Sequence, residues 1–136
     1  MATRSPEERA AVRAGLAVGL ATAVYGVSFG ALATLSGLDV WQTCFLSLVM
    51  FTGGSQFALI GVLASGGLAA GPAAITSAAL LGTRNVFYSI RMSPVIGPGF
   101  LRRAAAAQLT IDESVAVATA QPTLRSQRVG FWVTGI

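Results

Sequence analysis

The feature that most constrains the fold of this chain is a run of 44 residues without a formal charge, residues 40–83. A helix rises about 1.5 Å per residue, so about 20 residues are needed to cross roughly 30 Å of hydrocarbon. The run is therefore too long for one crossing and long enough for two. In its middle lies an island of glycine and small polar residues, Phe51-Thr52-Gly53-Gly54-Ser55-Gln56-Phe57.

The composition favours the same class of protein. Hydrophobic residues make up 54% of the chain and charged residues only 10%, whereas a soluble domain carries about 25% charged residues. All nine basic residues are arginines, and they lie between apolar runs instead of forming one patch with interleaved aromatic residues. This pattern is typical of membrane topology, and we expect no nucleic-acid partner.

Several kinds of catalytic and metal site are excluded by the residue types present. The chain has no histidine and a single cysteine, Cys44, so it can form neither a His-dependent triad nor a Cys/His zinc site. Serine hydrolysis around Gly54 and Ser55 would lack both a histidine base and a Ser-Lys dyad. We therefore expect no enzyme, no metal and no cofactor.

The N-terminal part predicts a tail followed by a spanning helix. Residues 1–13 form a polar cytoplasmic tail in which Pro6, Glu7 and Glu8 suit a first helical turn. Residues 14–38 are 25 uncharged residues and begin a single membrane domain, residues 14–136. Small residues recur there at helical spacing, which lets another helix approach closely. Alternatively, Tyr25 and Ser28 line a cavity beside this seam.

The rest of the chain predicts further helices, so the expected fold is all-α, a polytopic integral membrane helix bundle. Asp39 suits a helix cap, and residues 41–52 and 55–63 are apolar half-segments too short to span alone. Residues 73–91 form another apolar segment and residues 104–120 a helix. Loops are expected at Ser93-Pro94 and at residues 97–99, and a further membrane segment begins at Val129.

The paired glycines predict a discontinuous helix at Gly53-Gly54. In lipid, broken backbone survives only where protein or a water-filled cavity satisfies its N–H and C=O groups, and transporters build substrate sites in this way. The alternative is that the glycines only let helices cross tightly.

The orientation of the element around Gly53-Gly54 has two solutions. If residues 40–83 cross twice from a cytoplasmic N-terminus, Arg91, Arg102 and Arg103 lie outside, against the positive-inside tendency. If the element is re-entrant, these arginines become cytoplasmic, which the charge distribution prefers. Alternatively, Arg84 and Arg91 are buried against polar partners.

Five motifs along the chain carry a family resemblance. They are Phe29-Gly30-Ala31-Leu32-Ala33, Gly37-Leu38, Ser47-Leu48-Val49-Met50-Phe51-Thr52-Gly53-Gly54-Ser55-Gln56-Phe57-Ala58, Arg84-Asn85-Val86-Phe87-Tyr88-Ser89 and Asp112-Glu113-Ser114. In this order and spacing they resemble the AzlC family of branched-chain amino acid permeases, over roughly residues 15–120.

The resemblance implies a function and a partner. AzlC proteins are the large subunit of a two-component exporter that moves valine, leucine, isoleucine and sometimes methionine out of bacterial cells with a small AzlD-type membrane subunit. A multi-pass protein of the bacterial inner membrane is implied, and a homo-oligomer is left open. Family members are longer than this chain, so we expect a truncated product or a fragment.

One motif departs from the family pattern. Relatives usually carry Asn-x-Arg-His where this chain has Gly82-Thr83-Arg84-Asn85. The arginine is retained, while glycine replaces asparagine and Asn85 replaces histidine. If these groups bind substrate or relay protons in relatives, this chain does so differently or takes another substrate.

A branched amino acid needs donors for its carboxylate, acceptors for its ammonium group and an apolar pocket. Backbone N–H groups after Gly54, with Ser55 and Gln56, can bind a carboxylate at the positive end of a helix dipole. Arg84 is the alternative anchor, because its planar fork holds two oxygens at once. Otherwise Arg84 reaches an interface or pairs with Asp112 or Glu113.

Asp112 and Glu113 are the candidates for proton coupling. As neighbours on a helix they point about 100° apart, so at most one faces the pathway. A desolvated carboxylate there could exchange a proton with either side and couple export to the proton gradient. Alternatively, both are interfacial charges in a cytoplasmic loop.

Two functions follow. The first is a proton-coupled exporter subunit for branched-chain amino acids. The second is a non-transporting membrane assembly or regulatory module that partners a small AzlD-like subunit.

Overall fold

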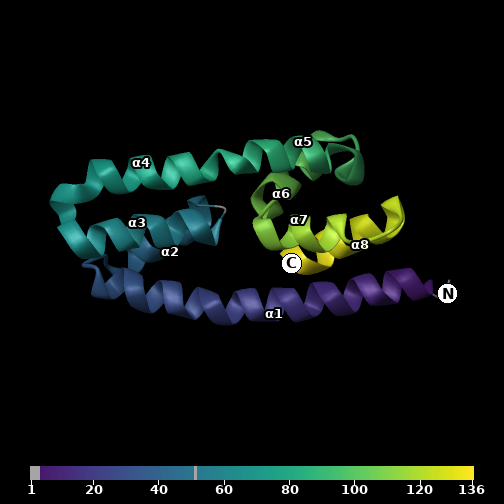
Figure 1. Cartoon of the computed structure of the whole chain (residues 1–136), viewed down its shortest axis with the longest axis horizontal. Coiled ribbons are helices and arrows are strands. Elements are labelled where there is room, and N and C mark those ends of the chain that lie inside the picture. Colours follow the sequence, from purple (N-terminus) through teal and green to yellow (C-terminus); the bar gives the residue numbers. More distant parts are fainter. Residues whose placement is uncertain (1–3, 51) are drawn as a thin grey trace. The chain divides into compact units, whose positions relative to one another are not determined.

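The computed structural model describes residues 4–50 and 52–136, and all regular structure in these residues is helical. The all-α prediction is therefore confirmed. Figure 1 shows the elements in chain order, coloured from the N-terminus to the C-terminus. Their bounds are α1 Pro6–Leu35, α2 Val40–Val49, α3 Gly53–Gly66, the short 3-10 helix η1 Leu68–Ala70, α4 Gly71–Gly82, α5 Arg84–Ile96, α6 Phe100–Leu109, α7 Asp112–Thr119 and α8 Leu124–Gly135.

Helix α1 starts within the predicted tail. The Ser5 hydroxyl accepts from the backbone N–H of Glu8, and the Glu8 carboxylate accepts from the N–H of Ser5 at 2.8 Å. This reciprocal cap, with Pro6 as the first helical residue, fixes the start of the helix. The predicted first turn at Pro6, Glu7 and Glu8 is thus confirmed.

The chain divides into two compact units, Met1–Ala23 with Asn85–Ile136, and Val24–Arg84. The unit Val24–Arg84 contains the charge-free run, and the other contains most of the arginines. The predicted division into a tail and one membrane domain stays a prediction.

Within Val24–Arg84, α2 and α3 form a helical hairpin. Figure 1 shows α3 running back beside α2 after the break between them. The Ser36 hydroxyl, which precedes α2, donates to the carbonyl of Ile60 in α3 at 3.5 Å, so the chain returns toward the start of α2. Asp39 caps α2, as predicted, in a reciprocal pair with Gln42.

The core of this unit is small and apolar. Phe29 and Ala33 of α1 pack with residues of α3 and α4, and Leu46 and Met50 border the cluster. The other buried members of the cluster are Leu59, Ile60, Leu63, Ala74 and Ala78. The alanines let α4 approach α3 closely, and α1 packs on the same cluster through Phe29 and Ala33.

The other unit contains two corrections to the sequence predictions. Pro94 lies inside α5, which continues to Ile96, so the predicted loop begins only at Gly97, whose φ of +81° favours glycine. The predicted helix over residues 104–120 is broken at Thr110, whose ψ of 87° is not helical. The Thr110 hydroxyl bonds back to the Ala106 carbonyl at 2.7 Å, and the break contains neither glycine nor proline.

Part of the predicted small-residue seam of α1 makes a close helix contact. A Cβ on Gly15 would lie 2.9 Å from a Val133 methyl, and one on Gly19 would lie 3.3 Å from the Thr134 carbonyl oxygen. These two glycines therefore let α1 approach α8 closely, whereas Gly26 and Gly30 have open space around them.

Among the described residues, α1 is the one helix that is both long and apolar enough to cross a membrane, judged by length and composition. Many large apolar side chains are also exposed, including Trp41 (84%), Leu35 (82%) and Phe87 (70%). Exposed apolar side chains occur in both units, and where they form a patch they mark contact with a partner or with lipid.

Candidate functional site

The candidate site lies at the tip of the α2–α3 hairpin. Helix α2 ends at Val49, and Met50 and Thr52 on either side of the tip are extended, with ψ of 112° and 130°. Helix α3 begins at Gly53, so the predicted discontinuity is present one to three residues earlier than the glycine pair. Residue 51 lies outside the described residues.

The break exposes main-chain groups of both helices. The first N–H groups of α3 have no acceptor within the helix, and the first helical bond runs from Gln56 N–H to the Thr52 carbonyl at 3.1 Å. Thr52 makes no side-chain cap. The last carbonyls of α2 face the same tip, so a positive and a negative helix end lie together.

The two glycines are needed because other side chains occupy their surroundings. A Cβ on Gly53 would collide with the ring and hydroxyl of Tyr25, and one on Gly54 would collide with a terminal nitrogen of Arg84. Tyr25 of α1 and Arg84 at the start of α5 therefore both lie directly against the beginning of α3.

Arg84 is held there by a specific contact. Its Nη2 donates to the Thr52 hydroxyl at 3.1 Å, across 32 residues of sequence. Thr52 is 3% exposed, so this bond is shielded from water. The guanidinium thus lies at the positive end of α3, where the helix dipole and the side-chain charge both favour an anion.

Ser55 contributes a buried hydroxyl. Its side chain is 3% exposed, and its Oγ has no hydrogen-bond partner among the described residues. It faces α4, because a Cβ on Gly82 would lie 3.6 Å from the Ser55 Oγ. A buried hydroxyl without a partner costs about 1–3 kcal/mol, so its position calls for an explanation.

Gln56 bridges the break. Its Nε2 donates to the Met50 carbonyl at 3.0 Å, which ties the end of α2 to the beginning of α3. One N–H of the amide is therefore committed to the hairpin, and its other N–H and its oxygen are the groups that could meet a ligand.

An aromatic stack borders the site on its apolar side. Tyr25 and Phe57 stack with centroids 4.9 Å apart, and Phe29 meets Phe57 edge-on at 6.1 Å. These rings join the polar tip to the apolar core of the unit. The sequence reading did not single out Thr52 or Phe57 for a role, although both belong to the glycine-containing motif.

The structure brings together six of the predicted site residues within Val24–Arg84: Tyr25, Gly53, Gly54, Ser55, Gln56 and Arg84. Asn85, Asp112 and Glu113 belong to the other unit. The Oδ1 of Asn85 is buried without a partner among the described residues. The predicted pairing of Arg84 with Asp112 or Glu113 stays a prediction.

Asp112 and Glu113 occupy the first turn of α7. Ser114, fully buried, accepts from the Ile111 N–H at 3.1 Å and donates to the Leu109 carbonyl at 2.6 Å. The acids thus lie at the positive end of a helix, where negative charge is stabilised. In the part of the chain that the structure describes, no cluster of three or more His, Cys, Asp or Glu could hold a metal.

The comparisons with known proteins give one match. A family model described as AzlC protein matches residues 17–136. The searches of curated proteins and of solved structures found no match. The matched segment contains both the hairpin tip and α7.

Proposed function

The chain belongs to the AzlC family, and on this basis we propose that it is a membrane transporter subunit that exports branched-chain amino acids, namely valine, leucine, isoleucine and methionine. The family membership supports a role related to branched-chain amino acid transport. The particular substrates, the direction and the energy source are part of the proposal.

The single observation that carries the proposal is that Arg84 is bound to Thr52 at the hairpin tip, beside the first N–H groups of α3. These groups are hydrogen-bond donors that suit a carboxylate, and the buried Ser55 hydroxyl in the same turn of α3 is a further donor without a partner among the described residues. The carbonyl end of α2 beside them suits an ammonium group. The tip therefore complements a zwitterion.

The substrate side chain would pack on the aromatic stack. Phe57 is half-buried, and its ring, which is backed by the buried Phe29, offers apolar surface next to the polar tip. A branched aliphatic side chain gains about 1.5–3 kcal/mol from full burial. Glycine and polar amino acids would lack this term, which favours valine, leucine and isoleucine.

The site would lie near the bilayer midplane. Tyr25 is close to the centre of the apolar part of α1, residues 14–35, about 16 Å from either end. Helix α2 has 10 residues and α3 has 14, so they are about 15 and 21 Å long. Transporters with discontinuous helices place their binding sites at this depth.

These lengths favour the re-entrant arrangement of the hairpin. Neither helix reaches the roughly 30 Å of hydrocarbon, and α3 returns beside α2. We expect Ser36→Cys and Ser65→Cys, in a Cys44→Ala background, to be labelled from the same side of the membrane by an impermeant maleimide. Labelling from opposite sides would mean that α2 and α3 cross in series.

Further parts of the assembly belong to the proposal. An AzlD-type membrane subunit would complete the transporter, in the inner membrane of a bacterium with several passes of this chain. Asp112 or Glu113 would couple export to the proton gradient. The exposed apolar side chains of α1, α2 and α4 support contact with lipid or with such a subunit.

The proposal is tested by efflux. Cells that express the chain with an AzlD-type subunit are loaded with a leucine-containing dipeptide, and the release of leucine is measured. We expect faster release than from cells carrying a Gly54→Ala variant at equal membrane abundance. Equal release from both, and from empty cells, would contradict an export function.

A further inference from the structure

Three arginines surround the loop between α5 and α6; Arg102, Arg103 and Arg128 are called the loop arginines below. Arg103 donates from Nε to the Gly97 carbonyl at 3.2 Å and from Nη2 to the Ser93 hydroxyl at 3.2 Å. Arg128 of α8 donates from Nε to the Val95 carbonyl at 2.8 Å. These bonds fix two of the three guanidinium groups against the loop.

The remaining nitrogens point to a common place. Measured from the position that a Cβ of Gly97 would take, Arg102 Nη1 is 3.8 Å away and Arg128 Nη2 is 3.9 Å away. One tetrahedral oxyanion just outside the loop can therefore meet donors from both arginines. Arg103, already fixed to the loop, adds its charge beside them.

The charge of these arginines is not balanced locally. Within residues 4–50 and 52–136, no carboxylate lies at ion-pair distance from the loop arginines, and Glu8 of this unit pairs with Arg125 instead. Arg102 and Arg103 also lie in the first turns of α6, which has no side-chain cap. Cations at that end oppose the helix dipole. A bound anion there would therefore be stabilised both by the arginine charges and by the dipole.

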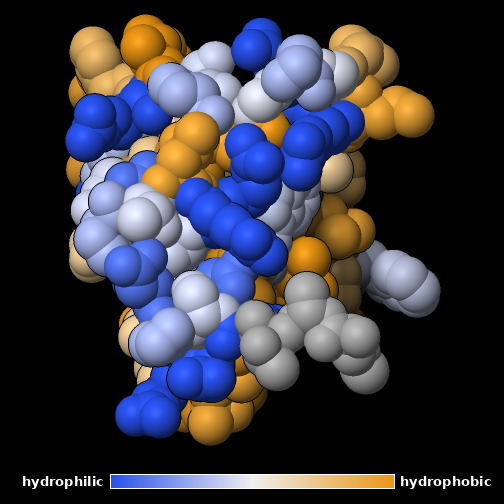
Figure 2. All heavy atoms as spheres, turned by 90° about the vertical axis from the view of Figure 1, so that its right-hand side faces the viewer, coloured by the Kyte–Doolittle hydropathy of each residue, from blue (hydrophilic) through white to orange (hydrophobic). Residues whose placement is uncertain are grey.

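The surrounding surface has the character of a membrane interface. Figure 2 shows hydrophilic residues gathered on the face that carries the α5–α6 loop, with hydrophobic residues at its borders. Phe100 and Leu101, directly before the arginines, are 84% and 82% exposed. Apolar side chains next to arginines at the start of one short helix are typical of an element that lies in the interface.

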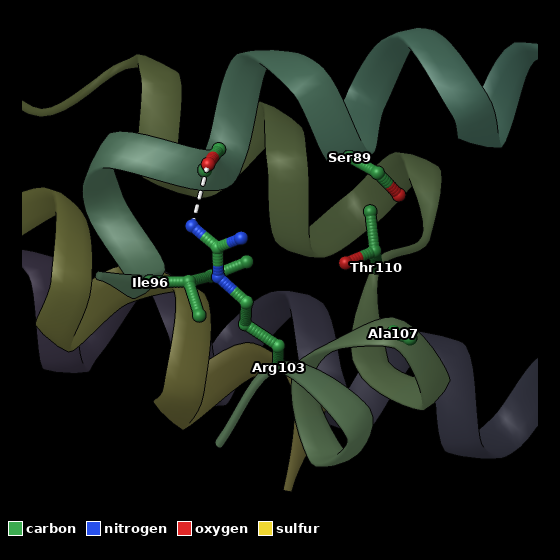
Figure 3. A pocket seen from close by; sticks show the side chains of 6 residues that line it. Ser89, Ile96, Arg103, Ala107 and Thr110 are labelled. Carbon is green, nitrogen blue, oxygen red and sulfur yellow. Dashed lines mark hydrogen bonds between the residues drawn. The ribbon is translucent and has the colours of Figure 1, made fainter. Parts of the chain in front are cut away.

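A cavity adjoins Arg103. It has a volume of about 180 Å³ and is lined by Ser89, Ser93, Ile96, Arg103, Ala107 and Thr110. Figure 3 shows the guanidinium of Arg103 at one side of this cavity and the hydroxyls of Ser89 and Thr110 at the other. Hydroxyl groups of a polar headgroup would find both donors and acceptors there.

We propose that the loop arginines bind the phosphate of an anionic phospholipid headgroup, with Phe100 and Leu101 inserted among the acyl chains. The phosphate lies between Arg102 and Arg128, and the headgroup reaches the cavity beside Arg103. Free phosphate shares the ionic chemistry, but it gains nothing from the two exposed apolar side chains. The site is separate from the hairpin tip.

The proposal is tested on the purified protein by native mass spectrometry with phosphatidylglycerol and phosphatidylcholine. We expect retention of phosphatidylglycerol over phosphatidylcholine in the wild type. Each basic residue near an anionic surface is worth about a fivefold change in affinity. Arg102→Gln should therefore lower the affinity for phosphatidylglycerol about fivefold, and Arg102→Gln/Arg128→Gln about 25-fold.

The matched control is Arg91→Gln, which makes the same charge change on an exposed arginine of α5 and should leave the lipid preference within about twofold of wild type. Phe100→Ser should weaken lipid binding as well. An equal loss in Arg91→Gln and Arg102→Gln would overturn the site, as would an unchanged preference in Arg102→Gln. If excess inorganic phosphate displaces the lipid and the lipid affinity of Phe100→Ser equals that of the wild type, the site binds free phosphate and not a lipid headgroup.

Discussion

Helices α3 and α7 both begin after a break in the chain, yet the two starts are completed in opposite ways. At α7, Asp112 and Glu113 place negative charge at the positive helix end, and Ser114 satisfies the backbone around the break. At α3, the first residues are glycines, the cap residue makes no cap, and Arg84 adds positive charge. The N-terminus of α7 is therefore satisfied by its own residues, whereas the N-terminus of α3 is positively charged and complementary to an anion.

Helix α1 shows that this difference follows from the sequence at each start. Ser5 and Glu8 cap α1 as Asp39 and Gln42 cap α2. The start of α3 has no side-chain cap, as at α4 and α6, but it differs from them in a buried serine hydroxyl that has no partner among the described residues. The proposed ligand site would explain that hydroxyl.

Among the variants that test this difference between α3 and α7, Gly54→Ala is expected to have the largest effect on leucine affinity. The added Cβ collides with the end of Arg84, which must move away from the start of α3. Losing a charge-assisted hydrogen bond should lower substrate affinity about tenfold to a hundredfold. The measurement is leucine binding by the purified complex.

Gly61→Ala is the matched control for Gly54→Ala, because Gly61 lies in the same helix with open space around it. It should bind leucine like the wild type and be more stable by about 0.5–1 kcal/mol. If both variants bind equally well, the glycine at 54 serves only the packing of the hairpin.

Arg84→Lys should have a smaller effect. Lysine keeps the charge but loses the planar fork, and with it about one hydrogen bond to a carboxylate. We expect affinity for leucine to fall about fivefold. Wild-type affinity in Arg84→Lys would make the arginine a structural group that holds Thr52.

Asp112→Asn and Glu113→Gln test the role of the two acids at the N-terminus of α7. If these acids serve the dipole of α7, each variant should lose about 0.3–1 kcal/mol of stability, measured by thermal unfolding, with the pH profile of export unchanged. If one of them couples protons, that variant alone should lose the pH dependence of export.

The smallest effect is expected at the start of α1. The backbone N–H of Ser5 lowers the pKa of Glu8 below its ordinary 4.5, and Arg125 lowers it further against the opposing effect of burial. Because the pKa is lower in the folded state, this stabilisation is present above pH 4.5 and is lost as the pH falls through the lowered pKa. In Glu8→Gln, the melting temperature should therefore fall less steeply below pH 4.5 than in the wild type.

Local signals predicted much of the fold. Asp39 before an apolar run gave the cap of α2, Pro6-Glu7-Glu8 gave the start of α1, and the glycine pair indicated the break before α3. Each depends on residues within one helical turn. The break at Thr110 was missed because residues 109–111 include neither glycine nor proline, the residues that mark helix ends in a sequence.

The assembly of the candidate site could be predicted only in part. The types of group needed for a carboxylate pointed to Ser55 and Arg84, but their meeting depends on contacts between distant segments. Arg84 reaches Thr52 across 32 residues, and Tyr25 reaches Gly53 from another helix. No hydrophobic periodicity or sequence motif predicts these contacts, because they depend on how α1, α3 and α4 pack against one another.

In the proposed re-entrant arrangement, a hairpin that turns at half depth would also divide the transmembrane voltage. A charge that travels from one face to the tip would cross about half of the potential, or roughly 1 kcal/mol per 100 mV. A zwitterionic amino acid has no net charge, so its passage would perform no electrical work. If export is coupled to a proton as proposed, any voltage dependence would therefore report the proton alone.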